Sequence, residues 1–266
     1  MVLFAALGLV MGSFVNVLIH RLPLMIEASH NATSTSRFDL SWPASHCPHC
    51  QARLRFWHNV PVLSFLVLQG RCAFCHRAIS VRYPLIELLT ALIWVACAWH
   101  WDAGWSSMSW ALFATILLAL SVIDAKTTLL PDLLTQTLLW LGLAASALDT
   151  THISSQDAVW GAILGYGSLW LIATVFEHAT GKVGMGAGDF KLLAALGAWL
   201  GAWTLIPLVF LASTTGALIG LILMLSKKMQ RHDYLPFGPF LAAAGALLAW
   251  LGHAQVLRAL QQLFIA

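Results

Sequence analysis

The stretch Gly184-Met185-Gly186-Ala187-Gly188-Asp189-Phe190-Lys191 joins a glycine-rich turn to an apolar run that continues to Leu200. Glycine has no Cβ, so another backbone, such as that of a substrate peptide, can approach closely beside it. The simplest role for Asp189 is a helix N-cap, because Asp is among the commonest residues at that position. A second carboxylate at matching membrane depth favours a catalytic role instead, and the chain has a candidate at Asp124.

The composition predicts an all-α polytopic membrane protein. Hydrophobic residues make up 59% of the chain and charged residues only 9%, a balance outside the usual range of soluble domains. A membrane-spanning helix needs about 20 apolar residues. Eight runs are candidates: residues 2–19, 84–99, 107–123, 133–148, 158–176, 190–200, 203–225 and 236–251. We expect a first transmembrane helix over residues 1–20, a loop domain over 21–83, and a core of about seven helices over 84–266.

The basic residues predict the orientation of this arrangement. In the eight-span arrangement, 13 of the 14 Lys and Arg residues lie on one face, and only Arg258 lies on the other. The positive-inside rule makes the crowded face cytoplasmic. Asp124 and Asp189 then both lie at the cytoplasmic edge of the membrane. The net charge of +3 follows from this topology and gives no reason to expect a nucleic acid partner.

Four of the five cysteines form two Cys-x-x-Cys pairs in the loop domain. Cys47 and Cys50 are separated from Cys72 and Cys75 by 21 residues, a spacing typical of a tetrathiolate zinc site. A loop of this size buries little core and needs such a staple. The alternatives are free buried thiols or a redox pair, although a reducing cytoplasm disfavours disulfides. We therefore predict a structural Zn²⁺ site.

Other polar or irregular positions accompany the two aspartates. A charged residue at the centre of a membrane helix costs about 2.5–3.5 kcal/mol, which makes Asp124 a functional candidate. Asp132 follows a proline and is expected to cap the next helix. Glu87 is expected in the first turn of the second span, where it complements the helix dipole. Pro236 and Gly238 indicate irregular backbone, which suits the wall of a site, or a simple helix start.

These motifs, in this order, resemble the type IV prepilin peptidases, membrane aspartic proteases of the GxGD type. The resemblance covers nearly the whole chain and includes both cysteine pairs. The other matching stretches are residues 12–17, 21–23, 59–64, 70–72, 82–87, Asp124 with 130–132, 184–191 and 236–239. Val183 departs from the pattern, because many members carry an acidic residue there.

The resemblance implies an enzyme that cleaves the leader of prepilins or pseudopilins after a glycine, at the cytoplasmic face of the bacterial inner membrane. Members with two activities then methylate the new N-terminus with S-adenosylmethionine, and the cysteine-bearing loop favours this form over a peptidase-only relative. By motif position the catalytic residues are Asp124 and Asp189. Gly184, Gly186, Gly188, Lys191, Glu87, Pro236 and Gly238 are expected to shape the substrate site. Membrane lipid is the other expected partner.

Two carboxyl groups that share a site cannot both ionise easily, so one holds a proton while the other activates water. Helix dipoles favour the carboxylate at a helix start and disfavour it at a helix end. We therefore predict that Asp124 holds the proton and that Asp189 is the base. Two other classes stay open: a transporter with intramembrane carboxylates, and a scaffold whose zinc module binds a partner.

Overall fold

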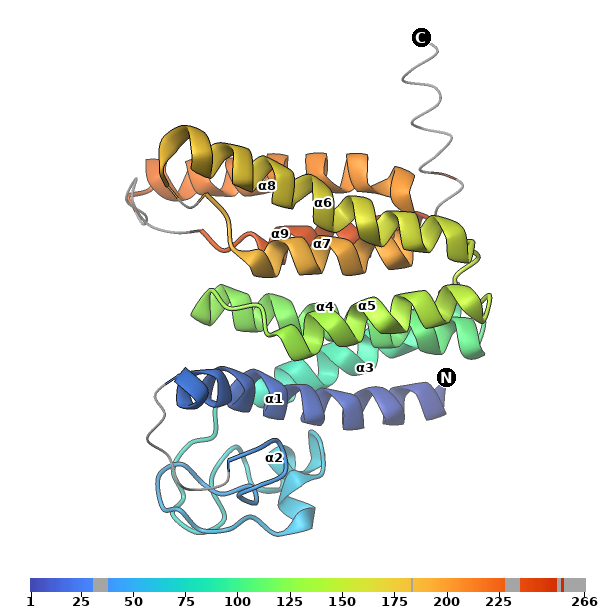
Figure 1. Ribbon diagram of the computed structural model, residues 1–266. Helices are drawn as coiled ribbons and strands as arrows, with labels where there is room; N and C mark the ends of the chain where they lie inside the picture. The colour runs from blue at the N-terminus through green and yellow to red at the C-terminus, as the bar shows by residue number, and fades with distance from the viewer. Residues whose placement is uncertain (31–37, 183, 228–234, 253–254, 256–266) are drawn as a thin grey trace. The chain divides into compact units, whose positions relative to one another are not determined.

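The computed structural model describes residues 1–30, 38–182, 184–227, 235–252 and 255 (Figure 1). Five residues used in the predictions above lie outside these ranges: Val183 and Arg258, and Arg37, Lys228 and Arg231, which are among the 13 basic residues counted on one face. Within the described ranges the chain is helical, with two isolated β-bridges and no strand. The helices are α1 (Val2–His30), η1 (Phe56–Asn59), α2 (Leu63–Val67), α3 (Arg82–His100), α4 (Trp105–Thr127), α5 (Asp132–Ala147), α6 (Ser155–Thr180), α7 (Ala187–Leu200), η2 (Ala202–Thr204), α8 (Leu205–Leu225) and α9 (Gly238–Leu251). The predicted all-α membrane fold is confirmed.

Each of the eight predicted apolar runs coincides with a helix, but eight membrane spans are not confirmed. Five described helical stretches are long and apolar enough to cross a membrane: α1, α3, α4, α6 and residues 202–225. Helices α5, α7 and α9 have only 16, 14 and 14 residues. At 1.5 Å per residue they are shorter than the hydrocarbon layer of about 30 Å. The first helix also continues to His30, past the predicted end at residue 20.

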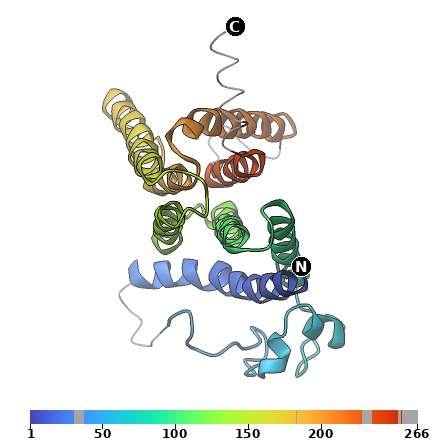
Figure 2. The ribbon, with the colours of Figure 1, turned by 90° about the vertical axis from the view of Figure 1, so that its right-hand side faces the viewer.

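The chain divides into two compact units, and the first comprises residues 1–115. Figure 2 shows α1 and α3 of this unit next to each other, with the cysteine-bearing segment (residues 38–81) beside them. The two helices pack backbone to backbone, because a Cβ on Gly12 would lie 2.6 Å from the Cα of Glu87. Asn16 adds a hydrogen bond from its side-chain amide to the Tyr83 carbonyl, at 3.1 Å. This helix pair supports the segment that carries the four cysteines.

The second unit comprises residues 116–266, and α7 is its central helix. Every residue of α7 from Leu192 to Leu200 is buried, as expected for a helix that is apolar on all sides. Helices α5, α6 and α9 contact it. The Trp199 indole donates a hydrogen bond to the Leu138 carbonyl on α5, at 2.8 Å. Because α7 is held on several sides, its N-terminal turn has a defined position.

Candidate active site

Asp124 lies in the last turn of α4, which ends at Thr127. Its backbone carbonyl accepts a hydrogen bond from the Thr128 amide at 2.8 Å, and Thr128 itself adopts a left-handed conformation with φ of +54°. This ends the helix and turns the chain towards α5. Only 3% of Asp124 is exposed, so its carboxyl group lies inside the protein.

Asp189 is the third residue of α7, after an N-cap at Gly186. The N-cap role considered for Asp189 is therefore wrong, because Gly186 occupies the cap position and its carbonyl accepts from the Asp189 amide at 3.1 Å. The Asp189 side chain is also 3% exposed, and the charges of the two aspartates act on each other. Two carboxyl groups from different helices thus share one buried region.

Leu130 fills the space beside both aspartates. A Cβ on Gly188, the residue before Asp189, would lie 2.8 Å from the Leu130 Cβ. A Cβ on Gly238, at the start of α9, would lie 3.1 Å from the Leu130 Cδ2. The short linker between α4 and α5 therefore packs against the glycines of α7 and α9. These glycines are needed for close packing within the protein.

The amide of Gly238 is a direct partner of Asp124. It donates a hydrogen bond to the Asp124 Oδ2 at 2.9 Å, and a Cβ on Gly238 would lie 2.6 Å from the same oxygen. The bond opposes the predicted protonation pattern, because an amide donor stabilises a carboxylate where the dipole of α4 disfavours one. Helix position alone therefore does not decide which aspartate holds the proton.

The other predicted site-shaping residues of this unit have different surroundings. Gly184 packs on a ring, since a Cβ there would lie 2.7 Å from the Phe176 Cδ1. Gly186 has space: its Cβ would meet Asp189 Oδ2 at 3.9 Å, an ordinary contact. Gly186 has φ of −77° and Gly188 lies within α7, so neither glycine is needed for a left-handed backbone. Gly188 allows close packing, and Gly186 leaves open space. Pro236 is half-buried two residues before α9 begins.

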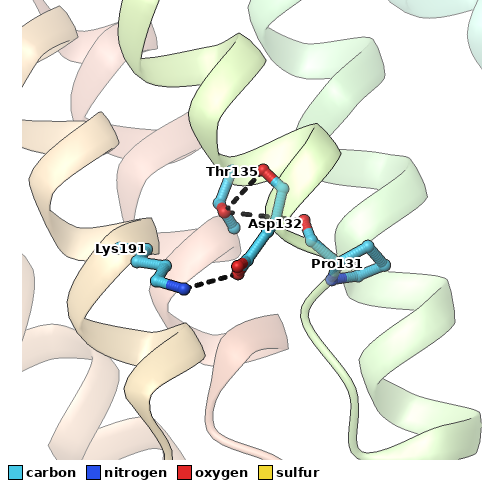
Figure 3. Close-up of polar contacts among 4 residues, drawn as sticks. All are labelled: Pro131, Asp132, Thr135 and Lys191. Atoms are coloured by element: carbon cyan, nitrogen blue, oxygen red, sulfur yellow. Dashed lines mark hydrogen bonds and ion pairs between the residues drawn. The ribbon is translucent and has the colours of Figure 1, made fainter. Parts of the chain in front are cut away.

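Asp132 forms an ion pair with Lys191. The Lys191 Nζ lies 2.6 Å from the Asp132 Oδ1 (Figure 3), which links the first residue of α5 to the fifth residue of α7. The predicted capping role of Asp132 is wrong, because Pro131 is the N-cap and Asp132 is the first helical residue. The pair is 59% exposed at Asp132 and 31% exposed at Lys191. Asp132 and Lys191 lie near Asp124 and Asp189 in sequence, but both are more exposed than the two aspartates.

Removing the ion pair between Asp132 and Lys191 is expected to change the stability of the protein only slightly. Exposed ion pairs contribute about 0–1 kcal/mol, so Asp132→Asn and Lys191→Met should each lower the melting temperature only slightly. The check is a thermal unfolding curve for each variant and for the double variant. If the ion pair is their only shared interaction, the double variant should be no less stable than either single one. A large loss of stability in Asp132→Asn alone would contradict this account.

Glu87 belongs to the first unit, where its carboxylate has internal partners. It is the sixth residue of α3, so the predicted position in the first helical turn is wrong. Its Oε2 accepts a hydrogen bond from the Val62 amide at 2.8 Å, and the Ser13 side chain is a second partner. Glu87 thus connects α1, α3 and the cysteine-bearing segment.

The four predicted zinc ligands lie together. The Sγ atoms of Cys47, Cys50, Cys72 and Cys75 are all within 4.8 Å of one another. The Sγ atoms of Cys47 and Cys75 are 3.9 Å apart. Tetrahedral zinc with Zn–S bonds of about 2.3 Å requires sulfurs about 3.8 Å apart. The donor set and its spacing therefore fit one zinc ion with no open coordination position.

Two thiols of this cluster, those of Cys47 and Cys50, have different pKa values. Backbone amides of Cys50 and His49 lower the pKa of the Cys47 thiol to about 6. For Cys50, the Ala52 amide lowers the pKa, but desolvation and the neighbouring cysteine sulfurs outweigh it and raise the pKa to about 11. One sulfur thus ionises easily beside another that keeps its proton. Binding of a divalent metal would release the remaining protons, since cysteine ligates as the thiolate.

Two residues with clear structural roles were not identified from the sequence. Leu130 was part of a matching motif, yet its packing between two glycines is a tertiary contact. Arg21 was counted as a topological charge and belonged to a matching motif, but its structural role was not predicted: it is 9% exposed and donates to the carbonyls of Asp39, Leu40 and Pro43. A charged residue within a helix that begins as an apolar run was the signal that could have indicated a buried role for Arg21.

Comparisons with known proteins cover both units. Residues 6–101 match a family model described as "Bacterial Peptidase A24 N-terminal domain", and residues 111–221 match "Type IV leader peptidase family". Three relatives are named prepilin leader peptidase/N-methyltransferase. Those from Stutzerimonas stutzeri and Pseudomonas aeruginosa are 43% and 44% identical, over 92% of this chain and 88% of theirs. The one from Pectobacterium carotovorum is 46% identical, over 90% and 88%. No solved structure matches the chain significantly.

Proposed function

Because this chain belongs to the type IV leader peptidase family, we propose that it cleaves the leader from prepilins or pseudopilins after a glycine, with Asp124 and Asp189 as catalytic residues. The relatives share 43–46% identity over about nine tenths of the chain, and they are named for both leader cleavage and N-methylation. Methylation of the new N-terminus is therefore the second activity of this chain. Its methyl donor is S-adenosylmethionine, which supplies the transferred methyl group when bound.

One observation carries the peptidase proposal: Asp124 and Asp189 are both buried and their charges interact, although they come from different helices. Two carboxyl groups in this arrangement share a proton. The ionised group takes a proton from a water molecule, which attacks the scissile carbonyl, and the neutral group donates its proton to the developing oxyanion or leaving amine. The Gly238 amide orients Asp124 for this exchange.

The substrate's own chemistry suits a site at a membrane edge. A prepilin has a basic leader followed by an apolar helix, so its cleavage point lies where water meets lipid. We place this edge at the cytoplasmic face of the bacterial inner membrane, because the positive-inside rule assigns the basic loops to that side. The open space at Gly186 beside Asp189 would then admit the glycine that precedes the cut.

The experiment is a cleavage assay with purified protein in lipid nanodiscs and a prepilin peptide. Mass spectrometry should detect loss of the leader, and with S-adenosylmethionine the product should gain the mass of one methyl group. Absence of cleavage under conditions where the protein is folded would refute the proposal. Cleavage without methylation would support the peptidase-only alternative, and solute uptake into proteoliposomes without cleavage would support the transporter.

We further propose that Cys47, Cys50, Cys72 and Cys75 bind one structural zinc ion. Metal analysis of the purified protein should find about one zinc per chain, since such sites use four ligands for one ion. A variant with all four cysteines changed to Ser should lose the metal and the order of the segment around it. Methylation should suffer more than cleavage, because both aspartates lie on other segments.

Cys97→Ser is the matched control for the zinc site. Cys97 is buried in α3 and lies outside the cluster of four sulfurs, so this variant should keep a full complement of zinc. If the variant with four Ser residues kept all of its zinc, the assignment of ligands would be wrong.

A further inference from the structure

The cysteine-bearing segment exposes a run of large apolar side chains. Six of the twelve residues from 56 to 67 are large, apolar and exposed: Phe56, Trp57, Val60, Leu63, Leu66 and Val67. Val67 is 81% exposed and Phe56 is 79% exposed. On α2 the Phe65 ring faces inwards against Gly70, whereas Leu63, Leu66 and Val67 face outwards. Large apolar side chains exposed together in one short stretch, called the apolar patch below, mark a binding surface on a folded protein.

A buried hydrogen bond sets the depth of this patch relative to the membrane. Helix α3 has 19 residues, so at about 28 Å it just crosses a hydrocarbon layer of about 30 Å. Glu87 is five residues inside its N-terminal end, which places it about 7 Å below the membrane boundary. The Val62 amide, immediately before α2, is bonded to this side chain at 2.8 Å. The start of α2 therefore lies within about 7 Å of the boundary where headgroups meet acyl chains.

The backbone at this contact is held in an unfavourable conformation. Val62 has φ of +58°, which a β-branched residue rarely adopts. The hydrogen bond to Glu87 and the packing of Gly12 on α3 hold this conformation in place. The depth of α2 is thus specified by buried contacts within residues 1–115.

The opposite edge of the same segment lies further from the membrane. Arg21 binds the carbonyls of Asp39, Leu40 and Pro43. It lies nine residues beyond Gly12 on α1, and Gly12 contacts Glu87, so Arg21 is about 14 Å further out along the helix than Glu87. The segment is consequently tilted, with α2 towards the lipid and residues 39–43 towards water.

The charge of the segment suits an anionic surface. Between residues 38 and 81 there are four arginines, Arg53, Arg55, Arg71 and Arg77, and a single acidic residue, Asp39. All four arginines are exposed, and the Arg55 guanidinium lies over the Trp57 ring, 5.2 Å from its centre. Exposed arginines near a bilayer surface are attracted to anionic lipid headgroups. Apolar, aromatic and basic side chains together are typical of interfacial membrane segments.

From depth, exposure and charge together, we infer that residues 56–67 are an interfacial membrane anchor. Leu63, Leu66 and Val67 insert at the boundary between headgroups and acyl chains, and the arginines bind anionic headgroups. The segment with the four cysteines is therefore seated on the bilayer, in addition to being joined to α1 and α3 by the chain. The occupant of the patch is lipid, because the bond between Glu87 and Val62 places α2 where lipid is already present.

The test uses photo-crosslinking of the full chain in nanodiscs of phosphatidylethanolamine and phosphatidylglycerol. Benzoylphenylalanine, which keeps the patch apolar, replaces Leu66 in one sample. Leu92, which is 65% exposed in the middle of α3, is the positive control, and Ser41, at the outer edge, is the negative control. Mass spectrometry should find lipid adducts at positions 66 and 92 and none at position 41. Crosslinks from position 66 to a second copy or to an added prepilin, with no lipid adduct, would overturn the inference.

A second measurement uses hydrogen exchange of the α2 amides. Leu66→Asp should lose the protection that anionic nanodiscs give to these amides, whereas Leu66→Met should retain it. Zinc content reports whether the segment is still folded in each variant, since its ligands lie outside α2. If Leu66→Asp binds zinc and keeps full protection in lipid, α2 is not membrane-inserted. If Leu66→Asp loses zinc, the segment is unfolded in that variant, and the crosslinking result at position 66 decides whether α2 is inserted in the membrane.

Discussion

Asp189→Asn is expected to abolish leader cleavage. General acid–base catalysis contributes about 10²- to 10⁴-fold, so the rate should fall by at least about 100-fold. The same loss is expected for Asp124→Asn, because neither carboxyl group can serve as acid and base alone. Since a buried Asn is nearly isosteric with Asp, the fold should persist, and circular dichroism and expression level check this. Cleavage rates of a prepilin peptide in nanodiscs are the measurement.

The matched control for the catalytic pair Asp124 and Asp189, called the dyad below, is Asp132→Asn. Asp132 is the acidic residue nearest to Asp124 in sequence, but unlike the two buried aspartates it is exposed and pairs with Lys191. We expect this variant to cleave at nearly the wild-type rate. If Asp132→Asn lost cleavage as completely as Asp189→Asn, or if Asp189→Asn cut normally at equal expression, the dyad assignment would be wrong.

Gly238→Ala is expected to have the second largest effect on cleavage. The added methyl group would lie 2.6 Å from the Asp124 Oδ2, so the carboxyl group or the start of α9 must move. That movement breaks the hydrogen bond from the Gly238 amide. A hydrogen bond to a charged group contributes about 1.5–3 kcal/mol. We therefore expect kcat/KM to fall by about 10- to 100-fold.

Gly186→Ala is the control for added bulk near the dyad. Its methyl group would meet the nearest atom, the Asp189 Oδ2, at an ordinary contact distance of 3.9 Å. The dyad geometry should survive, and any effect should appear in KM through the space left for the substrate. Equal kcat losses in Gly238→Ala and Gly186→Ala would show that bulk, and not the contact with Asp124, determines the effect.

The membrane anchor links the fold of the cysteine-bearing segment to the lipid around it. A segment seated on the bilayer keeps a constant height above α1 and α3, because it is held by Arg21, by Glu87 and by the lipid surface. Loss of zinc would then disturb the anchor as well as the local fold. Variants of the four cysteines should therefore be compared in nanodiscs as well as in detergent.

The sequence by itself determined the membrane class, the helical fold and the grouping of four cysteines, and it supplied Asp124 and Asp189 as the candidate catalytic residues. These follow from local patterns: apolar runs predict helices, and two Cys-x-x-Cys pairs predict the sulfur cluster. Helix lengths were less well determined, because hydropathy does not say where a short helix such as α7 stops or how α1 continues past Pro23. The two aspartates were identified by motif, without any knowledge of what surrounds them.

The tertiary structure alone decided which groups act on those residues. The Gly238 amide reaches Asp124 across 114 positions of sequence, and Lys191 reaches Asp132 across 59. Glu87, expected to complement a helix dipole, instead binds the Val62 amide of a distant loop. Sequence spacing reports only neighbours on the same helix or turn. Contacts between helices depend on how glycines and leucines such as Gly188 and Leu130 fit together, and that fit exists only in the packed protein.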